Sequence, residues 1–177
     1  TLGILAGLAM AKNFVTLYMF FEMMSLITVP LVLHSGTAAS RRAGFQYLGY
    51  SVFGAGMALA GYFFVAYYMA TPDFIHGGAI DPVKAAEHRP MLLVVYFLMI
   101  VGFGCKAGMM PMQSWLPAAH PVAPAPASAV LSGVITKAGV LAVLRVIYYL
   151  VGADVLRGTW VQKGFMTLTL ITVFMGS

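Results

Sequence analysis

The sequence contains few charged residues. Ten Lys and Arg and five Asp and Glu together make up 8% of its 177 residues, whereas an ordinary soluble domain is about 25% charged. Apolar residues account for 61%, and the mean hydropathy is +0.91. A chain with so few charged residues cannot form the polar surface that a soluble domain presents to water. This composition excludes a soluble globular domain and a disordered tail, and it predicts a membrane protein in contact with lipid.

Cysteine is also nearly absent. The single Cys105 excludes a disulfide framework, a CxxC redox pair and a cysteine-based zinc cluster. The stretch 102–107 matches G-x-G-x-x-A, but no strand precedes it and it is strongly apolar, so we do not interpret it as a nucleotide site. We expect no bound metal and no flavin, nicotinamide, haem or iron–sulfur cofactor. The basic residues are scattered, so the net charge of +5 does not indicate a nucleic-acid partner.

Long apolar runs divide the chain into spans. A helix needs about 20 mostly apolar residues to cross a hydrocarbon core about 30 Å thick. Complete spans are expected at residues 13–33, 43–72, 91–110 and 127–151, with partial helices at 2–11 and 164–177. The connections are expected to be a polar turn at 34–42, a long polar loop at 73–90 with a short surface helix at 83–88, and a loop at 152–163.

The predicted fold class is all-α, a polytopic transmembrane helix bundle with one discontinuous helix, because no segment alternates like a barrel strand. Residues 1–177 are expected to be part of a single transmembrane domain. The chain starts at Thr1 and stops at Ser177 inside apolar stretches, so we expect an internal piece of a longer protein. The positive-inside rule places the Arg41-Arg42 loop in the cytoplasm, but other basic residues favour the opposite side and leave the orientation open.

Three charged residues lie at membrane depth on three different spans. Glu22 and Lys137 are ten and eleven residues into their spans, and Lys106 is about 22 Å along its own. Each charge costs at least about 2.5–3.5 kcal/mol at the centre of a helix, so these side chains should face one another, a polar cavity or water. Burial disfavours their charged forms, and a buried Lys can therefore exchange protons near neutral pH. Three such groups on three helices are the minimum for a proton relay. The alternatives are structural pairing of Glu22 and extension of Lys106 toward the interface.

The sequence around Lys106 predicts an interruption of the helix. Gly104 and Gly108 flank it, and Pro111 follows; all three disfavour a continuous helix. Freed backbone groups at membrane depth are tolerated only against protein or a water-filled cavity. A second short helical piece is expected at residues 112–119. His120 follows it, and its titration range suits proton transfer, although it could also cap a helix end.

At residues 106–120, KAGMMPMQSWLPAAH resembles the broken-helix signature of antiporter-like membrane subunits, which occur in respiratory complex I, Mrp-type cation/proton antiporters and membrane-bound hydrogenases. The segment 123–139, with Leu144-Arg145, is similar to the next helix of that family. Residues 20–26, FFEMMSL, resemble its Glu-bearing helix. The resemblance covers nearly the whole chain, in order, but only a middle portion of a family subunit, which has about fourteen helices.

The resemblance implies a role for each candidate residue. Glu22 would form an ion pair with Lys106, Lys137 would pass protons along a central hydrophilic axis, and His120 would lie on the connecting route. Two positions depart from the family pattern. Ala118 stands where members often have an acidic residue, and Gln113 where many have His, so the route past the break is not fixed by the resemblance.

We therefore expect a proton- or cation/proton-translocating subunit of a larger complex in a bacterial or archaeal inner membrane. Its partners would be other membrane subunits, lipid, and protons or Na⁺. No redox chemistry is expected in this chain, so the driving reaction or ion gradient would lie elsewhere. Two alternatives remain: an intramembrane quinone-binding enzyme subunit that uses His120 and Trp115, and a purely structural membrane subunit.

Overall fold

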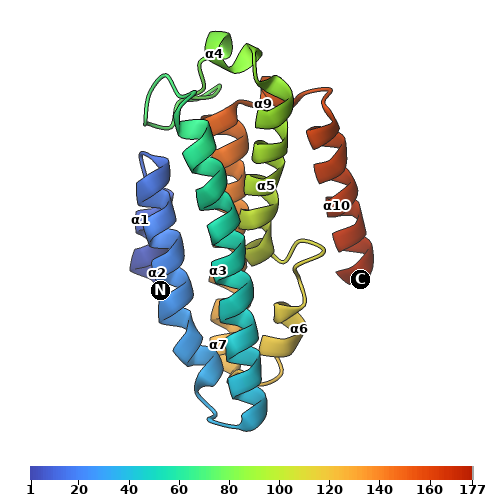
Figure 1. Cartoon of the computed structure of the whole chain (residues 1–177). Helices are drawn as coiled ribbons and strands as arrows, with labels where there is room; N and C mark the ends of the chain where they lie inside the picture. Colours follow the sequence, from blue (N-terminus) through green and yellow to red (C-terminus); the bar gives the residue numbers. More distant parts are fainter. Residues whose placement is uncertain (177) are drawn as a thin grey trace.

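The computed structural model describes residues 1–176 and consists of helices joined by turns and loops (Figure 1). Near the N-terminus lie α1 (Leu2–Ala9), α2 (Phe14–Leu33) and α3 (Ala38–Ala66). The middle of the chain forms α4 (Pro82–Ala86), α5 (Arg89–Ala107) and α6 (Trp115–Ala119). The last part forms α7 (Ala125–Val130), η1 (Leu131–Ile135), α8 (Thr136–Arg145), η2 (Val146–Val151), α9 (Ala153–Leu156) and α10 (Trp160–Gly176), where η1 and η2 are π-helical.

Four helices in residues 1–176 are long and apolar enough to cross a membrane. They are α2, α3, α5 and the continuous helix Ala125–Val151 that α7, η1, α8 and η2 form together. These helices match the four predicted spans, and the all-α transmembrane bundle is confirmed. The predicted short surface helix also forms, as α4.

Two predicted connections are shorter in the structure than in the sequence interpretation. The turn at 34–42 ends early, because Thr37 caps α3 by accepting a 3.1 Å hydrogen bond from the Ser40 N–H. A threonine at this position satisfies one of the unpaired N–H groups of a helix start. Arg41 and Arg42 therefore lie within the helix. The loop at 152–163 likewise contains α9 and the first turn of α10.

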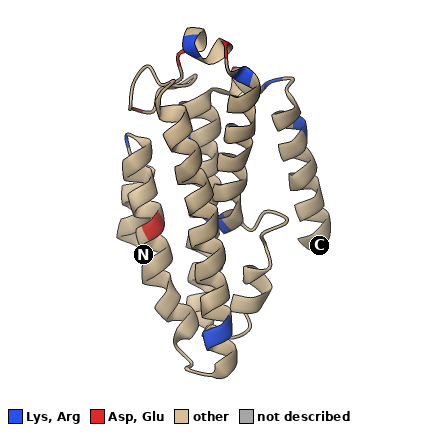
Figure 2. Cartoon of the chain, viewed as in Figure 1, with Lys and Arg blue, Asp and Glu red and all other residues tan. Residues whose placement is uncertain are grey.

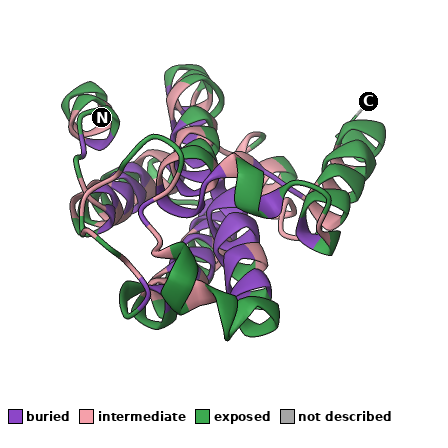
Figure 3. Cartoon of the chain, turned by 90° about the horizontal axis from the view of Figure 1, so that it is seen from above, coloured by how far each residue is buried: buried purple, intermediate pink, exposed green. Residues whose placement is uncertain are grey.

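Helix α5 is the centre of the bundle, and most of its residues are buried. Glycines allow its neighbours to approach closely. A Cβ at Gly54 of α3 would overlap the Gly102 carbonyl of α5, and a Cβ at Gly139 of α8 would overlap the backbone of Lys106 and Ala107. Figure 3 shows the buried residues gathered on the inner helices, whereas the helix at the C-terminus is mostly exposed. The central position of α5 places its last turn inside the bundle.

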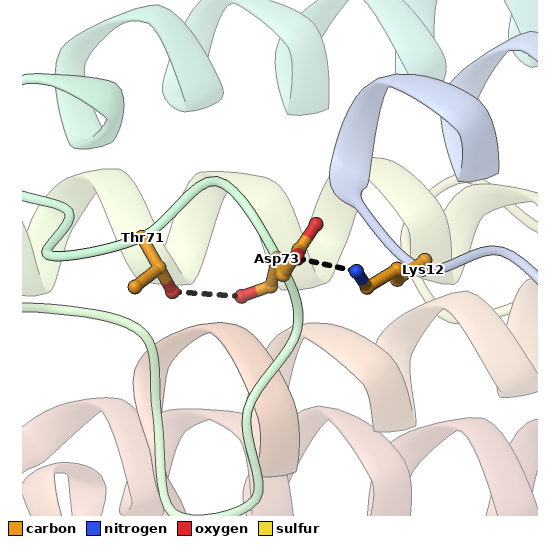
Figure 4. Close-up of polar contacts among 3 residues, drawn as sticks. All are labelled: Lys12, Thr71 and Asp73. Carbon is orange, nitrogen blue, oxygen red and sulfur yellow. Dashed lines mark hydrogen bonds and ion pairs between the residues drawn. The ribbon is translucent and has the colours of Figure 1, made fainter.

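The loop after α3 links early and late parts of the chain at one end of the bundle. Lys12 Nζ lies 2.9 Å from Asp73 Oδ2, and the Phe74 N–H donates to the Lys12 carbonyl at 2.8 Å. Thr71 donates its hydroxyl to the Asp73 carbonyl at 3.4 Å (Figure 4). The same loop reaches η2, where the Ala79 N–H donates to the Leu150 carbonyl at 2.8 Å. This connection fixes the start of α2 relative to the end of η2.

Candidate functional site

Helix α5 ends at Ala107, so the predicted interruption between Met91 and Pro111 is confirmed. Gly108 has φ 84°, a conformation that glycine adopts without the steric cost of a Cβ. Its N–H donates to the Cys105 carbonyl at 3.1 Å, and the Met109 N–H donates to the Gly104 carbonyl at 2.9 Å. These two bonds are the Schellman pattern, which satisfies carbonyls at a helix end. The interruption is thus a capped helix end next to Lys106.

The non-helical backbone after α5 finds polar partners on the surrounding helices. Trp115 Nε1 of α6 donates to the Cys105 carbonyl in the last turn of α5 at 2.9 Å, which ties the far end of this segment to α5. The Met110 N–H donates to Thr172 of α10 at 2.9 Å, and Gln46 of α3 donates to the Ser114 carbonyl at 3.3 Å. Irregular backbone is tolerated at membrane depth only when protein or water satisfies it. The break is therefore a supported part of the fold between α3 and α10.

The amine of Lys106 is enclosed by one turn of α2. Lys106 is only 1% exposed. Its Nζ donates to the hydroxyl of Ser25 and, at 3.2 Å, to the carbonyl of Phe21. The same nitrogen lies 4.4 Å from the centroid of the Phe21 ring, a cation–π distance. A backbone oxygen, a hydroxyl and an aromatic face thus stabilise an ammonium group inside the bundle.

Glu22 lies beside this pocket and is half-buried. The implied direct ion pair is not formed: the ion pairs within residues 1–176 join Lys12 to Asp73 and Arg157 to Asp154. Glu22 directly follows Phe21, whose carbonyl and ring contact Lys106 Nζ, so the two opposite charges lie near each other and attract. Glu22 Oε1 is buried without a hydrogen-bond partner among the described residues. Figure 2 shows acidic colour midway along α2 and basic colour at the inner end of α5, apart from the coloured segments at the ends of the bundle.

Lys137 lies at the depth of Lys106 but on the other side of α8. Gly139 packs against the backbone of Lys106 and Ala107, and Lys137 precedes it by two residues, about 3 Å along the helix axis. Two residues also rotate the side chain by more than half a turn, so Lys137 points away from α5 and is exposed in this chain. The structure therefore does not bring Lys137 into contact with Lys106 or Glu22.

His120 lies between the two short helices that follow the break. It is half-buried after α6, and its Nδ1 is 2.7 Å from the Ser128 hydroxyl of α7. This bond holds the imidazole at the junction of α6 and α7. Of the four predicted residues, the structure brings only Glu22 and Lys106 close to each other, and the roles of all four stay predictions.

Sequence reasoning did not single out the hydroxyl groups near Lys106. Ser25 and Thr28 are fully buried on α2, and Thr28 Oγ1 lies 2.7 Å from the Tyr47 hydroxyl of α3. The signal available in the sequence was two polar residues at helical spacing after Glu22 in an otherwise apolar span. Residues 1–176 contain no group of three His, Cys, Asp or Glu side chains that could hold a metal ion.

Known proteins resemble this chain over most of its length. The family model described as NADH:quinone oxidoreductase/Mrp antiporter, transmembrane, matches residues 11–177. Hydrogenase-4 component B of Escherichia coli (strain K12) is 34% identical over 144 residues, which are 80% of this chain and 20% of that protein. One of the Na(+)/H(+) antiporter subunits of Alkalihalophilus pseudofirmus is 28% identical over 171 residues, 96% of this chain and 32% of that protein.

Solved structures share the fold. The membrane-bound sulfane sulfur reductase, an archaeal respiratory membrane complex, contains a chain that matches with TM-score 0.71 at 19% identity, covering 94% of this chain and 32% of that one. A chain of the Mrp complex from Dietzia sp. DQ12-45-1b matches with TM-score 0.67 at 20% identity, covering 81% and 27%. The chain spans between 20% and 32% of the length of the relatives described here. On the match to residues 11–177, the chain belongs to the NADH:quinone oxidoreductase/Mrp antiporter transmembrane family.

Proposed function

We propose that the protein containing this chain translocates protons, or exchanges a cation for protons, as an antiporter-like subunit of a multisubunit membrane complex. The main support for this proposal is Lys106. Its amine is fully buried, and it lies at the capped end of an interrupted transmembrane helix. A charged lysine at membrane depth is costly, and by default it marks a functional site. Relatives are named as subunits of Na(+)/H(+) antiporters and of NADH-quinone oxidoreductase, which supports the same conclusion.

Glu22 provides the means of switching Lys106. An opposite charge nearby favours the ammonium form, and burial favours the neutral amine. The Glu22 carboxylate is half-buried and makes no direct contact with Lys106. A movement of this carboxylate toward the amine therefore promotes proton uptake, and a movement away promotes release. Glu22 would therefore control whether Lys106 holds a proton, without accepting that proton itself.

Lys137 is the second proton carrier of the proposed relay. It lies at the depth of Lys106 and is exposed on the outer face of α8 in residues 1–176. A charge at that depth requires water or a polar partner, which further helices of the longer protein would supply. We propose that protons pass between Lys106 and Lys137 around the end of α5, with His120 on the connecting route. The partners are other subunits in a bacterial or archaeal inner membrane.

Replacing Lys137 tests the relay. Lys137→Met removes the charge and keeps the length of the side chain, and Lys137→Arg keeps a charge that cannot be released. Proton uptake is measured in vesicles that hold the complete parent complex, and the driving reaction is assayed alongside. We expect both variants to assemble and to lose proton uptake. Lys163→Met on exposed α10 is the matched control. Parental uptake by Lys137→Met would exclude Lys137 from the relay, and loss of assembly would identify a structural ion pair.

A further inference from the structure

Buried hydroxyl groups gather along one contact of the bundle. Among residues 1–176, the buried polar or charged side chains are Ser25, Thr28, Ser40, Ser51 and Lys106. Apart from Lys106, all of them belong to α2 or α3, which pack against each other. The buried Tyr47 of α3 adds a fifth hydroxyl to this contact. We call the line of Ser25, Thr28, Tyr47 and Ser40 the hydroxyl seam.

The hydroxyl seam begins at Lys106 and continues along α2. Lys106 Nζ donates to Ser25 Oγ. One turn further on, Thr28 Oγ1 lies 2.7 Å from Tyr47 Oη. After another turn, Ser40 Oγ donates to the Val32 carbonyl at 2.7 Å. Polar atoms thus occur at each successive turn of α2 after the amine.

The hydroxyl seam ends at an exposed surface. The Ser40 N–H donates to Thr37 Oγ1, and both Thr37 and Ser35 are exposed in the turn between α2 and α3. From Phe21 to Leu33, α2 advances about 18 Å at 1.5 Å per residue, slightly more than half of a hydrocarbon core about 30 Å thick. The seam therefore has the length needed to connect a mid-membrane amine with one face of the membrane.

Local hydrogen bonding alone does not account for this arrangement. Ser and Thr in a transmembrane helix commonly donate to the carbonyl four residues earlier, as Thr28 does to Met24 at 2.7 Å. Such bonds need no partner from another helix. Here Tyr47 and Ser40 reach from α3 to α2, and Lys106 reaches from α5. Three helices direct polar atoms into the same contact.

We propose that the hydroxyl seam conducts protons between Lys106 and the turn joining α2 to α3; this inference rests on the proton translocation proposed above. The Lys106 ammonium gives a proton to the oxygen of Ser25, whose own hydroxyl proton moves on. Thr28, Tyr47 and water molecules that enter the seam each accept one proton and release another. The proton leaves to bulk water beside Thr37. The Lys106 amine is then neutral, and each hydroxyl again carries one proton.

A break in the hydrogen bonding of α2 occurs at the level of the hydroxyl seam, on the exposed side of the helix. Pro30 lies inside α2 and has no N–H, so the Leu26 carbonyl loses its helical partner. Helices bend most readily at such positions. The position falls between Thr28 and Val32. Among the described residues, no hydrogen bond joins one hydroxyl to the next there or between Ser25 and Thr28, so water has to complete the seam at both places. Bending of α2 there would admit the water that the transfer steps require.

The first test removes the hydroxyls and preserves the shape of the side chains. Thr28→Val and Tyr47→Phe, alone and together, are assayed for proton uptake in vesicles that hold the complete complex. We expect Tyr47→Phe and Thr28→Val to slow uptake at least fivefold each, and Thr28→Ser, which keeps the hydroxyl, to retain the parental rate. Matched controls are Thr169→Val, which removes a similar helical hydroxyl from exposed α10, and Tyr62→Phe on α3.

Lys106→Met separates the two proposals. Loss of uptake in Lys106→Met, together with parental uptake in assembled Thr28→Val and Tyr47→Phe variants, would overturn the seam and leave the proposed function intact. Parental uptake in Lys106→Met would overturn the proposed function itself. Slow uptake in the seam variants with normal assembly supports the seam.

A second measurement does not depend on the activity of the variants. Thr28 and Leu17 are both buried on α2. The working complex carrying Thr28→Cys or Leu17→Cys is treated with a small water-soluble thiol reagent, and the parent protein gives the background labelling of Cys105. We expect labelling of Thr28→Cys and none of Leu17→Cys, because only the first lies in the hydroxyl seam. Equal absence of labelling at both positions would overturn water entry and the route with it.

Discussion

The amine of Lys106 is bound by the hydroxyl of Ser25, which lies one helical turn after Phe21, and not by the neighbouring carboxylate of Glu22. Two different groups on α2 therefore act on one lysine. Ser25 and the Phe21 carbonyl hold the ammonium by direct contact, whereas Glu22 acts on it through space. This division leaves the Glu22 carboxylate without a direct bond to the lysine on which it acts.

Ser25→Ala is expected to weaken the site without disrupting the fold. A hydrogen bond to a charged group contributes about 1.5–3 kcal/mol, and its loss should slow proton uptake by about tenfold or more, since about 1.4 kcal/mol corresponds to a factor of ten. Ser25→Thr, which keeps a hydroxyl, should retain most of the rate. Ser35→Ala in the exposed turn is the control. Unchanged uptake in Ser25→Ala would show that this contact has no role in transport.

Gly139→Ala should destabilise the protein because there is no space for a Cβ between α8 and α5. The added methyl group would overlap the backbone of Lys106 and Ala107, and overpacking of this kind typically costs about 1–3 kcal/mol. Gly133→Ala, at a helical position with no neighbouring atom within 4 Å, should be neutral or stabilising. Thermal unfolding of the purified complex compares the two. A Gly139→Ala variant as stable as Gly133→Ala would contradict the packing of α8 on α5.

Gly108→Ala should destabilise the end of α5. Gly108 has φ 84°, and a residue with a Cβ pays roughly 1–2 kcal/mol in this left-handed conformation. Gly108→Asn should carry a smaller conformational cost, because Asn tolerates positive φ better than other residues. Both variants also place a Cβ against Leu116 Cδ1, which has to shift. The measurement is thermal unfolding, with Gly3→Ala in α1 as control. Equal stability of Gly108→Ala and the parent protein would show that α5 does not end in this conformation.

Asp73→Asn is expected to have a small effect. The ion pair with Lys12 is largely exposed, and exposed pairs typically contribute about 0.2–1 kcal/mol. Backbone bonds also hold the same loop, including that from the Phe74 N–H to the Lys12 carbonyl. We expect a shift in unfolding temperature of at most a few degrees, and a smaller one in high salt. A loss of assembly in Asp73→Asn would contradict this assignment and show that the ion pair organises the loop.

The sequence alone predicted the transmembrane fold well because its signals are local. Run length and hydropathy located four spans, and the Gly104, Gly108 and Pro111 pattern located the end of α5. The start of α3 was missed, because the polar Arg41 and Arg42 resemble a turn unless the Thr37 cap is recognised. Depth in the membrane could likewise be counted along each span for Glu22 and the two lysines.

The direction in which each side chain points from its helix could not be predicted in the same way. Lys106 and Lys137 have the same depth, yet one points into the bundle and the other away from α5. This difference depends on which face of α8 packs on α5, and only the close approach at Gly139 reveals it. The partner of Lys106 was also missed, because the counted positions do not show that Ser25 faces α5.

The most direct test of the central claim is proton uptake by the complete complex carrying Lys106→Met. Methionine fills a similar volume without a charge, so the bundle should assemble, and Lys84→Met in exposed α4 is the control. We expect Lys106→Met to assemble and to lose proton uptake, whereas Lys84→Met should retain it. Proton uptake at the parental rate by an assembled Lys106→Met complex would contradict proton transfer through Lys106.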